Sequence, residues 1–75
     1  MNLLDLSIGE SAKVKKIHAS SELKRRLISF GVIKGAEVEL LATAPAKSTV
    51  EIRVGKMKIA LRKEEAKTIE VEKNE

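Results

Sequence analysis

Ser20 to Gly35 reads S-S-E-L-K-R-R-L-I-S-F-G-V-I-K-G, and it is the part of the chain where the spacing of apolar residues changes. On either side, apolar residues recur at a period of two, whereas here the period is about 3.6, which is typical of an α-helix. Leu23, Leu27 and Phe30 lie at i, i+4 and i+7 and so share one face. The sequence therefore predicts one helix, with these three side chains facing the core.

The ends of this helix are also marked in the sequence. Ser20 or Ser21 can begin it, because a serine hydroxyl accepts a hydrogen bond from an otherwise unpaired amide of the first turn. Gly31 can end it, because a residue without a Cβ enters the left-handed conformation at little cost. We expect Val32 or Ile33 to pack back onto the last turn.

Strands are predicted on both sides of the helix from apolar residues that alternate. The first should run from Ala12 to Ile17, with a bulge near Lys16 because the alternation slips by one. The second strand should cover residues 36–43, with Val38, Leu40 and Ala42 on one face. A hairpin should follow over residues 50–61, with Gly55-Lys56 as a type II′ turn. The last strand should cover residues 68–71, after a helical turn at 63–66.

This order of elements predicts a mainly β fold: a small, partly open barrel of about five strands, with one helix between the first and second strands and a short helical turn before the last. We expect the helix to cap one mouth of the barrel, and Leu3, Leu4 and Leu6 to form a lead-in that covers an open end of the core. The tail from Glu72 to Glu75 should fray. The predicted core residues are Leu23, Leu27, Phe30, Val38, Leu40, Val50, Ile52, Ile59, Leu61, Ile69 and Val71.

Composition narrows the class of protein. The 75 residues fit one domain and contain no cysteine, which excludes disulfides and thiolate metal sites. No apolar run has the length of a membrane span or signal peptide, so a soluble, cytoplasmic protein is expected. The net charge is +4, and the excess is local: residues 13–34 hold seven Lys or Arg against Glu22 alone. A basic surface that meets an acidic partner is one use for it.

Motifs spread over nearly the whole chain resemble the FeoA family, the small ferrous-iron transport protein A domain. The resemblance rests on Leu6 with Gly9, R-L-x-x-F-G at Arg26 to Gly31, and V-x-x-G at Val32 to Gly35. It continues with I-A-L-R at Ile59 to Arg62, E-A at Glu65 and Ala66, and I-x-V at Ile69 to Val71. The sequence departs from the family pattern in two places: the family usually has Leu in place of Phe30, and Pro45-Ala46-Lys47-Ser48-Thr49 replaces a Pro-Leu-Gly-Asp-Pro type segment.

The resemblance implies an SH3-like domain over residues 1–75. From the residues, a disordered tail at about 73–75 is expected, and no enzyme activity, because no hydroxyl is paired with a base and no glycine-rich phosphate loop is present. The resemblance further implies a cytosolic accessory protein of ferrous-iron uptake that contacts a membrane permease carrying a cytosolic GTP-binding domain. From the residues, the partner-binding surface is predicted on the outer side of the helix and the turn after it, and Arg26 is left out of that set. The predicted contact residues are Lys24, Arg25, Ile28, Ser29, Ile33 and Lys34.

Other functions stay open at this point. The basic cluster could bind single-stranded RNA, although such proteins usually add aromatic stacking platforms and this chain has only Phe30. A metal-responsive role, like that of similar domains in iron-dependent repressors, is a second alternative. His18 is the one histidine and a weak candidate ligand for ferrous iron, because such sites usually need several His, Cys or carboxylate donors. No cofactor is therefore expected.

Overall fold

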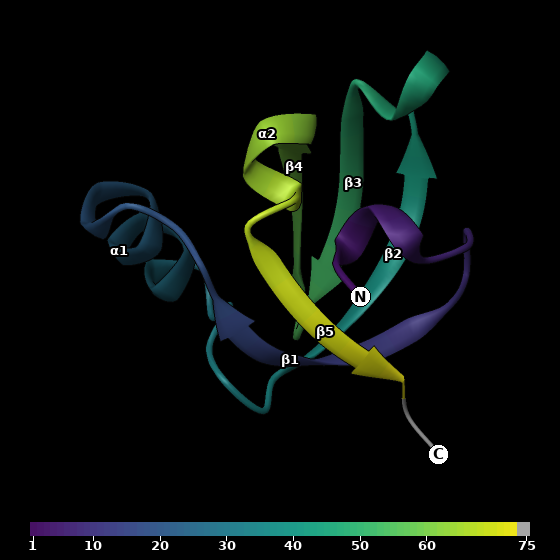
Figure 1. The fold of residues 1–75 in the computed structure, drawn as a ribbon. Coiled ribbons are helices and arrows are strands. Elements are labelled where there is room, and N and C mark those ends of the chain that lie inside the picture. Colours follow the sequence, from purple (N-terminus) through teal and green to yellow (C-terminus); the bar gives the residue numbers. More distant parts are fainter. Residues whose placement is uncertain (74–75) are drawn as a thin grey trace.

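The computed structural model describes residues 1–73, which form a five-stranded antiparallel sheet in the order β4-β3-β2-β1-β5 (Figure 1). The strands are β1 (Ser11–Ile17), β2 (Glu37–Thr43), β3 (Thr49–Val54), β4 (Met57–Arg62) and β5 (Ile69–Lys73). The helices are α1 (Ser21–Ser29) and α2 (Lys63–Ala66), with short 3₁₀ helices η1 (Leu3–Asp5) and η2 (Pro45–Lys47). The mainly β fold with its single longer helix between β1 and β2 confirms the prediction.

Two register shifts curve the sheet. In β1 the pairing with β5 shifts between Val14 and Lys16, as the slipped alternation predicts. In β2 the pairing with β3 shifts between Leu40 and Ala42. This second shift was not predicted, and it reverses the face of the residues that follow, so Ala42 is exposed rather than aligned with Val38 and Leu40.

The β3–β4 hairpin follows the predicted alternation and turn. Val50, Ile52 and Val54 are all buried, and Gly55 at the first turn position has a φ of +60°, which a type II′ turn requires there. Along β4 burial is weaker, because β4 lies at the edge of the sheet. Leu61 is buried, but Ile59 is only partly buried, which corrects its assignment to the core.

The ends of α1 match the sequence pattern. The Leu23 amide donates to the Ser20 hydroxyl at 3.5 Å, so Ser20 is the N-cap. Gly31 adopts a φ of +92°, and the Val32 amide then donates to the Leu27 carbonyl at 3.0 Å. Val32 is fully buried, whereas Ile33 is turned outward.

α1 packs against the core through two leucines, Leu27 and Leu23. Figure 1 shows α1 on the left of the molecule, away from α2 and η1, which contact each other. Leu27 is the one fully buried residue of α1. Leu23 is partly buried and packs against the core, whereas Phe30, at the C-cap, is partly buried but is not part of the core cluster. Leu3, Leu6 and Ala66 supply the buried side chains of the N-terminal and α2 segments, so the N-terminal segment does cover the core as expected.

The core is aliphatic throughout the described residues and contains no buried polar side chain. β5 extends to Lys73, which pairs with Ala12 in the ladder and whose ammonium lies 3.4 Å from the Glu10 carboxylate. The expectation that Glu72 and Lys73 fray is therefore wrong, and residues 74–75 lie outside the described part. Within 1–73, no helix combines the length and apolarity that crossing a bilayer requires. The buried core residues are Leu3, Leu6, Ala12, Val14, Ile17, Leu27, Val32, Val38, Leu40, Val50, Ile52, Val54, Leu61, Ala66, Ile69 and Val71.

Candidate functional site

An open groove of about 430 Å³ lies where β1, α1 and the turn after α1 meet. The link between β1 and α1 is only three residues long, so the helix stays close to the end of the strand. The segment 32–35 then returns toward β1, because the Gly35 amide donates to the Val14 carbonyl at 2.8 Å. The residues that line this groove are Lys15, Lys16, Ile17, Lys24, Ile28, Ile33 and Lys34.

Three isoleucines give the groove its apolar surface. Ile17 belongs to the core and is 9% exposed, whereas Ile28 and Ile33 are 47% and 48% exposed. Ile28 lies one residue beyond the buried Leu27 and is therefore rotated by about 100° around the helix, away from the core. Two large apolar side chains thus face solvent in the groove, which is typical of a contact surface when polar residues surround them.

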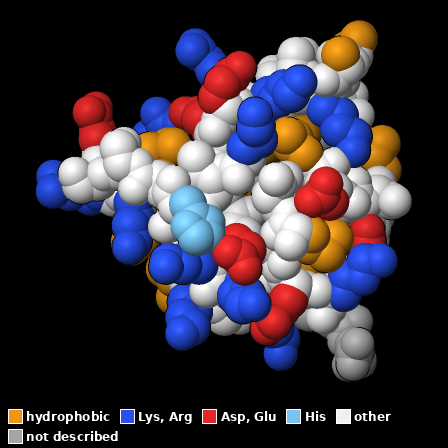
Figure 2. All heavy atoms as spheres, in the orientation of Figure 1, with side chains coloured by type: hydrophobic (Ala, Val, Ile, Leu, Met, Phe, Trp, Pro, Cys, Tyr) orange, Lys and Arg blue, Asp and Glu red, His pale blue; other side chains and the backbone are white. Residues whose placement is uncertain are grey.

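Four lysines surround these isoleucines and leave the groove positively charged. Among residues 1–73, Lys16, Lys24 and Lys34 form no ion pair, and Lys15 alone has a carboxylate nearby, with its ammonium 3.6 Å from Glu70. In Figure 2, basic side chains predominate on the left of the molecule, where Figure 1 places α1 and the adjoining end of β1. Such a surface attracts an acidic partner and speeds its encounter.

The structure brings together four of the six predicted contact residues: Lys24, Ile28, Ile33 and Lys34 all line the groove. Arg25 and Ser29 lie on α1 but do not line it, and the Ser29 hydroxyl donates to the Arg26 carbonyl at 2.6 Å within the same helix.

Three residues that line the groove were not predicted as contact residues: Lys15, Lys16 and Ile17. All three lie at the end of β1. Lys15 and Lys16 belong to the basic stretch 13–34, but the predicted contact was confined to the helix and its following turn. The short link between β1 and α1 was the available signal, because it holds the end of β1 beside the helix.

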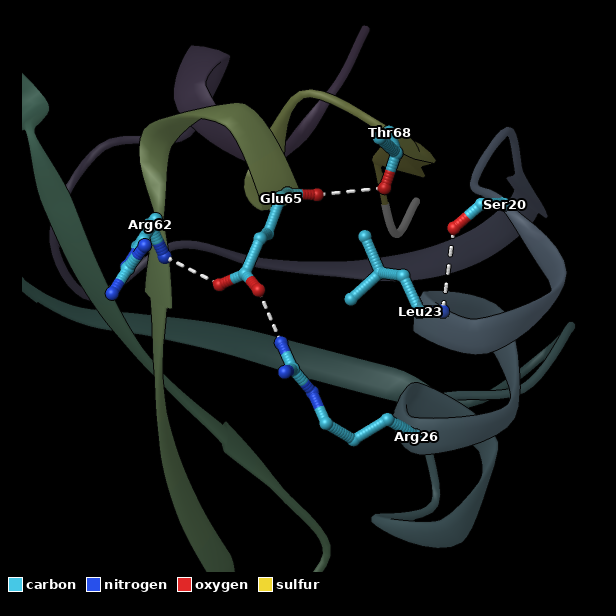
Figure 3. Close-up of polar contacts among 6 residues, drawn as sticks. All are labelled: Ser20, Leu23, Arg26, Arg62, Glu65 and Thr68. Carbon is cyan, nitrogen blue, oxygen red and sulfur yellow. Dashed lines mark hydrogen bonds and ion pairs between the residues drawn. The ribbon is translucent and has the colours of Figure 1, made fainter.

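Arg26 has a structural role on the other side of α1 (Figure 3). Its guanidinium forms an ion pair with Glu65 of α2. The other Glu65 carboxylate oxygen accepts the Arg62 amide at 2.9 Å, and the Thr68 hydroxyl donates to the Glu65 carbonyl at 2.7 Å. The Arg62 hydrogen bond, aided by Arg26 and opposed by burial, lowers the pKa of Glu65 below its usual value. This cluster fixes α1 to α2.

His18 lies at a similar ion-pair cluster and not at a set of metal ligands. Its Nε2 is 2.7 Å from Glu70 Oε1, while the Lys15 ammonium approaches the second oxygen of Glu70. The hydrogen bond with His18, and then the charge of Lys15, lower the pKa of Glu70. Within 1–73, no group of three or more His, Cys, Asp or Glu side chains gathers to hold a metal, and a lysine beside the carboxylate disfavours a second cation there.

The single aromatic residue does not contribute to the groove. Phe30 borders a separate hollow near β4, together with Arg26 and Glu65. A single-strand nucleic-acid site usually stacks bases on aromatic side chains, and no residue lining the groove is aromatic. The lining favours a protein partner with acidic and apolar side chains.

Known proteins that are similar in sequence to this chain are ferrous-iron transport proteins or contain such a protein as one part. The family model described as FeoA domain matches residues 1–73. A putative Fe(2+) transport protein A from Campylobacter jejuni is 37% identical over 71 residues, which cover 95% of this chain and 96% of that protein. A fusion of Fe(2+) transport protein A with the Fe(2+) transporter FeoB from Porphyromonas gingivalis is 28% identical over 72 residues, which are 96% of this chain but 8% of the fusion.

Solved structures share the fold. Iron(II) transport protein A from Clostridium thermocellum has a TM-score of 0.90 and 37% identity, over 97% of this chain and 45% of that one. FeoA from Stenotrophomonas maltophilia, complexed with zinc and described as an SH3 domain protein, has a TM-score of 0.83 and 36% identity over 96% of this chain and 89% of that one. A manganese-dependent transcriptional repressor has a TM-score of 0.88 at 18% identity, over 97% of this chain and 36% of that one, which shows a common fold alone.

Proposed function

The chain belongs to the FeoA family, and from this membership we propose that it is a cytosolic accessory protein of ferrous-iron transport that binds the cytosolic part of a membrane iron permease. The observation that carries the proposal is the Porphyromonas gingivalis fusion, in which a segment similar to 96% of this chain is joined to FeoB. Joining two modules in one polypeptide gives them a high effective concentration, which suits partners that act together.

The groove between β1, α1 and the following turn is the surface that we assign to this contact. Its exposed Ile28 and Ile33 provide the apolar centre that holds a partner, and its lysines provide the charged rim that orients it. A complementary surface on the permease would carry acidic residues around an apolar side chain. The domain itself supplies no catalytic step in this proposal; it acts by binding.

The test is a titration of this protein with the purified cytosolic domain of the permease, in which NMR of this protein detects binding. We expect shifts confined to the groove, and the double substitution Lys24→Glu with Lys34→Glu should weaken binding by about tenfold or more at low salt and less at high salt. The matched control reverses two exposed lysines outside the groove, Lys56→Glu with Lys67→Glu. Unchanged affinity of the groove variant, or equal weakening by the control, would remove the groove from the interface.

Arg25 and Ser29 provide a finer test of the predicted contact set. Both lie on α1, but neither lines the groove. If the partner is seated in the groove, Arg25→Glu should weaken binding less than Lys24→Glu, because the charge at residue 25 is farther from the buried part of the contact. If Arg25→Glu is the more damaging change, the partner covers the outer side of α1 instead.

A further inference from the structure

The two edges of the sheet differ in whether the chain covers them. At the β5 edge, the Met1 carbonyl accepts the Val71 amide at 2.8 Å, and Asn2 forms a bridge with Glu70. At the opposite edge, β4 pairs with β3 on one side. No other part of residues 1–73 pairs with its second side. An uncovered edge strand offers a row of backbone donors and acceptors to another chain.

The register identifies which backbone groups of β4 are free. The two-residue turn joins Val54 to Met57, and hydrogen-bonded positions then alternate along an antiparallel pair. Lys63 continues the same alternation, because its amide donates to the Ser48 carbonyl at 3.0 Å. The amides and carbonyls of Lys58 and Ala60 therefore point away from β3, and within 1–73 they have no partner outside the sheet.

The side chains beside these free groups favour a particular ligand. Lys58, Ala60 and Arg62 share the solvent face, so two cations stand four residues apart. A hollow of about 580 Å³ also borders β4. Its walls include Ala60, Leu61 and Arg62 of the strand, Phe30 beyond the end of α1, and Glu65, whose carboxylate accepts the Arg62 amide. The edge thus combines open backbone groups, positive charge and a partly apolar recess next to a half-buried aromatic ring.

We propose that β4 binds an extended acidic segment of another protein, which adds to the sheet as a sixth strand. Side chains of the added strand alternate between the two faces. Residues opposite Lys58 and Arg62 would be acidic, and the residues between them that point to the other face would be apolar, beside the partly buried Ile59 and the buried Leu61. The ligand pattern is acidic, apolar, any residue, apolar, acidic. This proposal does not depend on the function proposed above, because it concerns a different surface.

Charge argues against a second copy of the chain as the occupant. Symmetric antiparallel pairing about Ala60, which would use both of its free groups, places Lys58 opposite Arg62 twice. Like charges directly opposite each other destabilise a strand pair, and lysines on an edge generally discourage self-association. The same two cations attract an acidic strand.

The experiment measures binding of two synthetic peptides to the full chain by calorimetry and NMR. One has the core Glu-Val-Thr-Val-Glu and the other the core Lys-Val-Thr-Val-Lys. We expect the acidic peptide to bind at least about tenfold more tightly, and Lys58→Glu to remove most of that preference. Equal binding of the two peptides, binding of neither, or dimerisation of the protein through β4 would overturn the proposal.

The substitution Ala60→Pro tests the backbone contact directly. Proline at this position removes only an amide that points to solvent, so the β3–β4 ladder is kept. Ala60→Val keeps the amide and serves as the control. We expect the proline variant to lose about tenfold in affinity for the acidic peptide. Should it fail to fold, amide exchange of the unmodified protein decides: protection of Lys58 and Ala60 on adding the peptide supports the added strand, and unchanged exchange contradicts it.

Discussion

Leu27 is the residue through which α1 is anchored to the core. It is fully buried, while its neighbours Arg26 and Ile28 are exposed. The Val32 amide donates to the Leu27 carbonyl, so the same residue also holds the segment that leaves the helix. One position therefore fixes both the helix and the turn that contributes Ile33 and Lys34 to the groove.

Replacing Leu27 with Asp should unfold the domain. Loss of a buried leucine side chain costs about 2–5 kcal/mol, an unpaired buried carboxylate adds to that cost, and small domains are stable by about 5–15 kcal/mol. Thermal and urea unfolding followed by circular dichroism measure the effect. Ile28→Asp, at a half-exposed site one residue along, should leave the unfolding free energy within about 1 kcal/mol of the parent. A cooperative melt of the Leu27 variant near that of the parent would show that this side chain is not anchored.

At the scale of the elements, the turns differ in whether the residues with a left-handed backbone conformation are glycines. Gly31 ends α1 with a φ of +92°, a conformation that favours glycine. In η2, by contrast, Ala46 and Lys47 adopt φ values of 59° and 56° without being glycine. Lys47 stands where the family-type segment has its Gly, and its ammonium donates to the Leu4 carbonyl. This contact ties the atypical loop to η1.

Two substitutions of opposite direction test this difference. Gly31→Ala should lower the unfolding free energy by about 1–2 kcal/mol, because a side chain is forced into the left-handed region, although the added Cβ would meet Val54 only at an ordinary 3.6 Å. Ala46→Gly should raise it by about 0.5 kcal/mol, since the relief of strain exceeds the entropy that glycine adds to the unfolded chain. Chemical denaturation measures both. Equal signs for the two changes would contradict the backbone argument.

The elements themselves could largely be predicted from local pattern. Alternation gave β3 and β4 with their turn, and the serine and glycine signals gave both ends of α1. Leu23 and Leu27 face the core as the helical pattern predicts, but Phe30 does not, because it lies at the C-cap beyond the last helical residue and borders the hollow near β4. Ala42 was placed on the wrong face because a register shift in β2 leaves no local signal in the sequence.

Only part of the groove could be predicted, because the sequence shows local patterns and not which distant segments pack together. The residues contributed by α1 and its turn follow from the helical pattern and the charge, and the predicted set includes four residues that line the groove: Lys24, Ile28, Ile33 and Lys34. The β1 residues enter only through tertiary packing, which periodicity does not describe. The free edge of β4 likewise depends on the order of strands in the sheet, and that order is a property of the whole fold.

At the scale of the molecule, three glutamates join segments that are distant in sequence. Glu10 meets Lys73, Glu65 meets Arg26, and Glu70 meets His18 and Lys15. The pKa of each carboxyl is lowered, in Glu10 mainly by the hydrogen bond from the Ser7 amide and in the others by the contacts described above. These ion pairs connect β1 with β5 and α1 with α2.

Stability should therefore fall in acid. A carboxyl whose pKa is lower in the folded than in the unfolded state stabilises the fold at pH values above its unfolded-state pKa of 4.5. This stabilisation is lost as the pH falls through the lower pKa of the folded state. Melting temperatures measured from neutral pH downward should decline below about pH 4.5. Glu65→Gln should reduce the decline, and Glu51→Gln, at an exposed site, should not. A melting temperature independent of pH in this range would contradict the assignment.

The pairing of β1 with β5, and of Met1 and Asn2 with β5, has a consequence for how the chain reaches its fold. β5, which pairs with one side of β1, is synthesised after the other four strands, and the N-terminal segment that covers the core bonds to that same strand. Contacts between residues far apart in sequence slow folding, because a long loop must close before they form. During synthesis the hairpin of β3 and β4 can form early, whereas Val14 and Leu3 find their final neighbours only once β5 has left the ribosome.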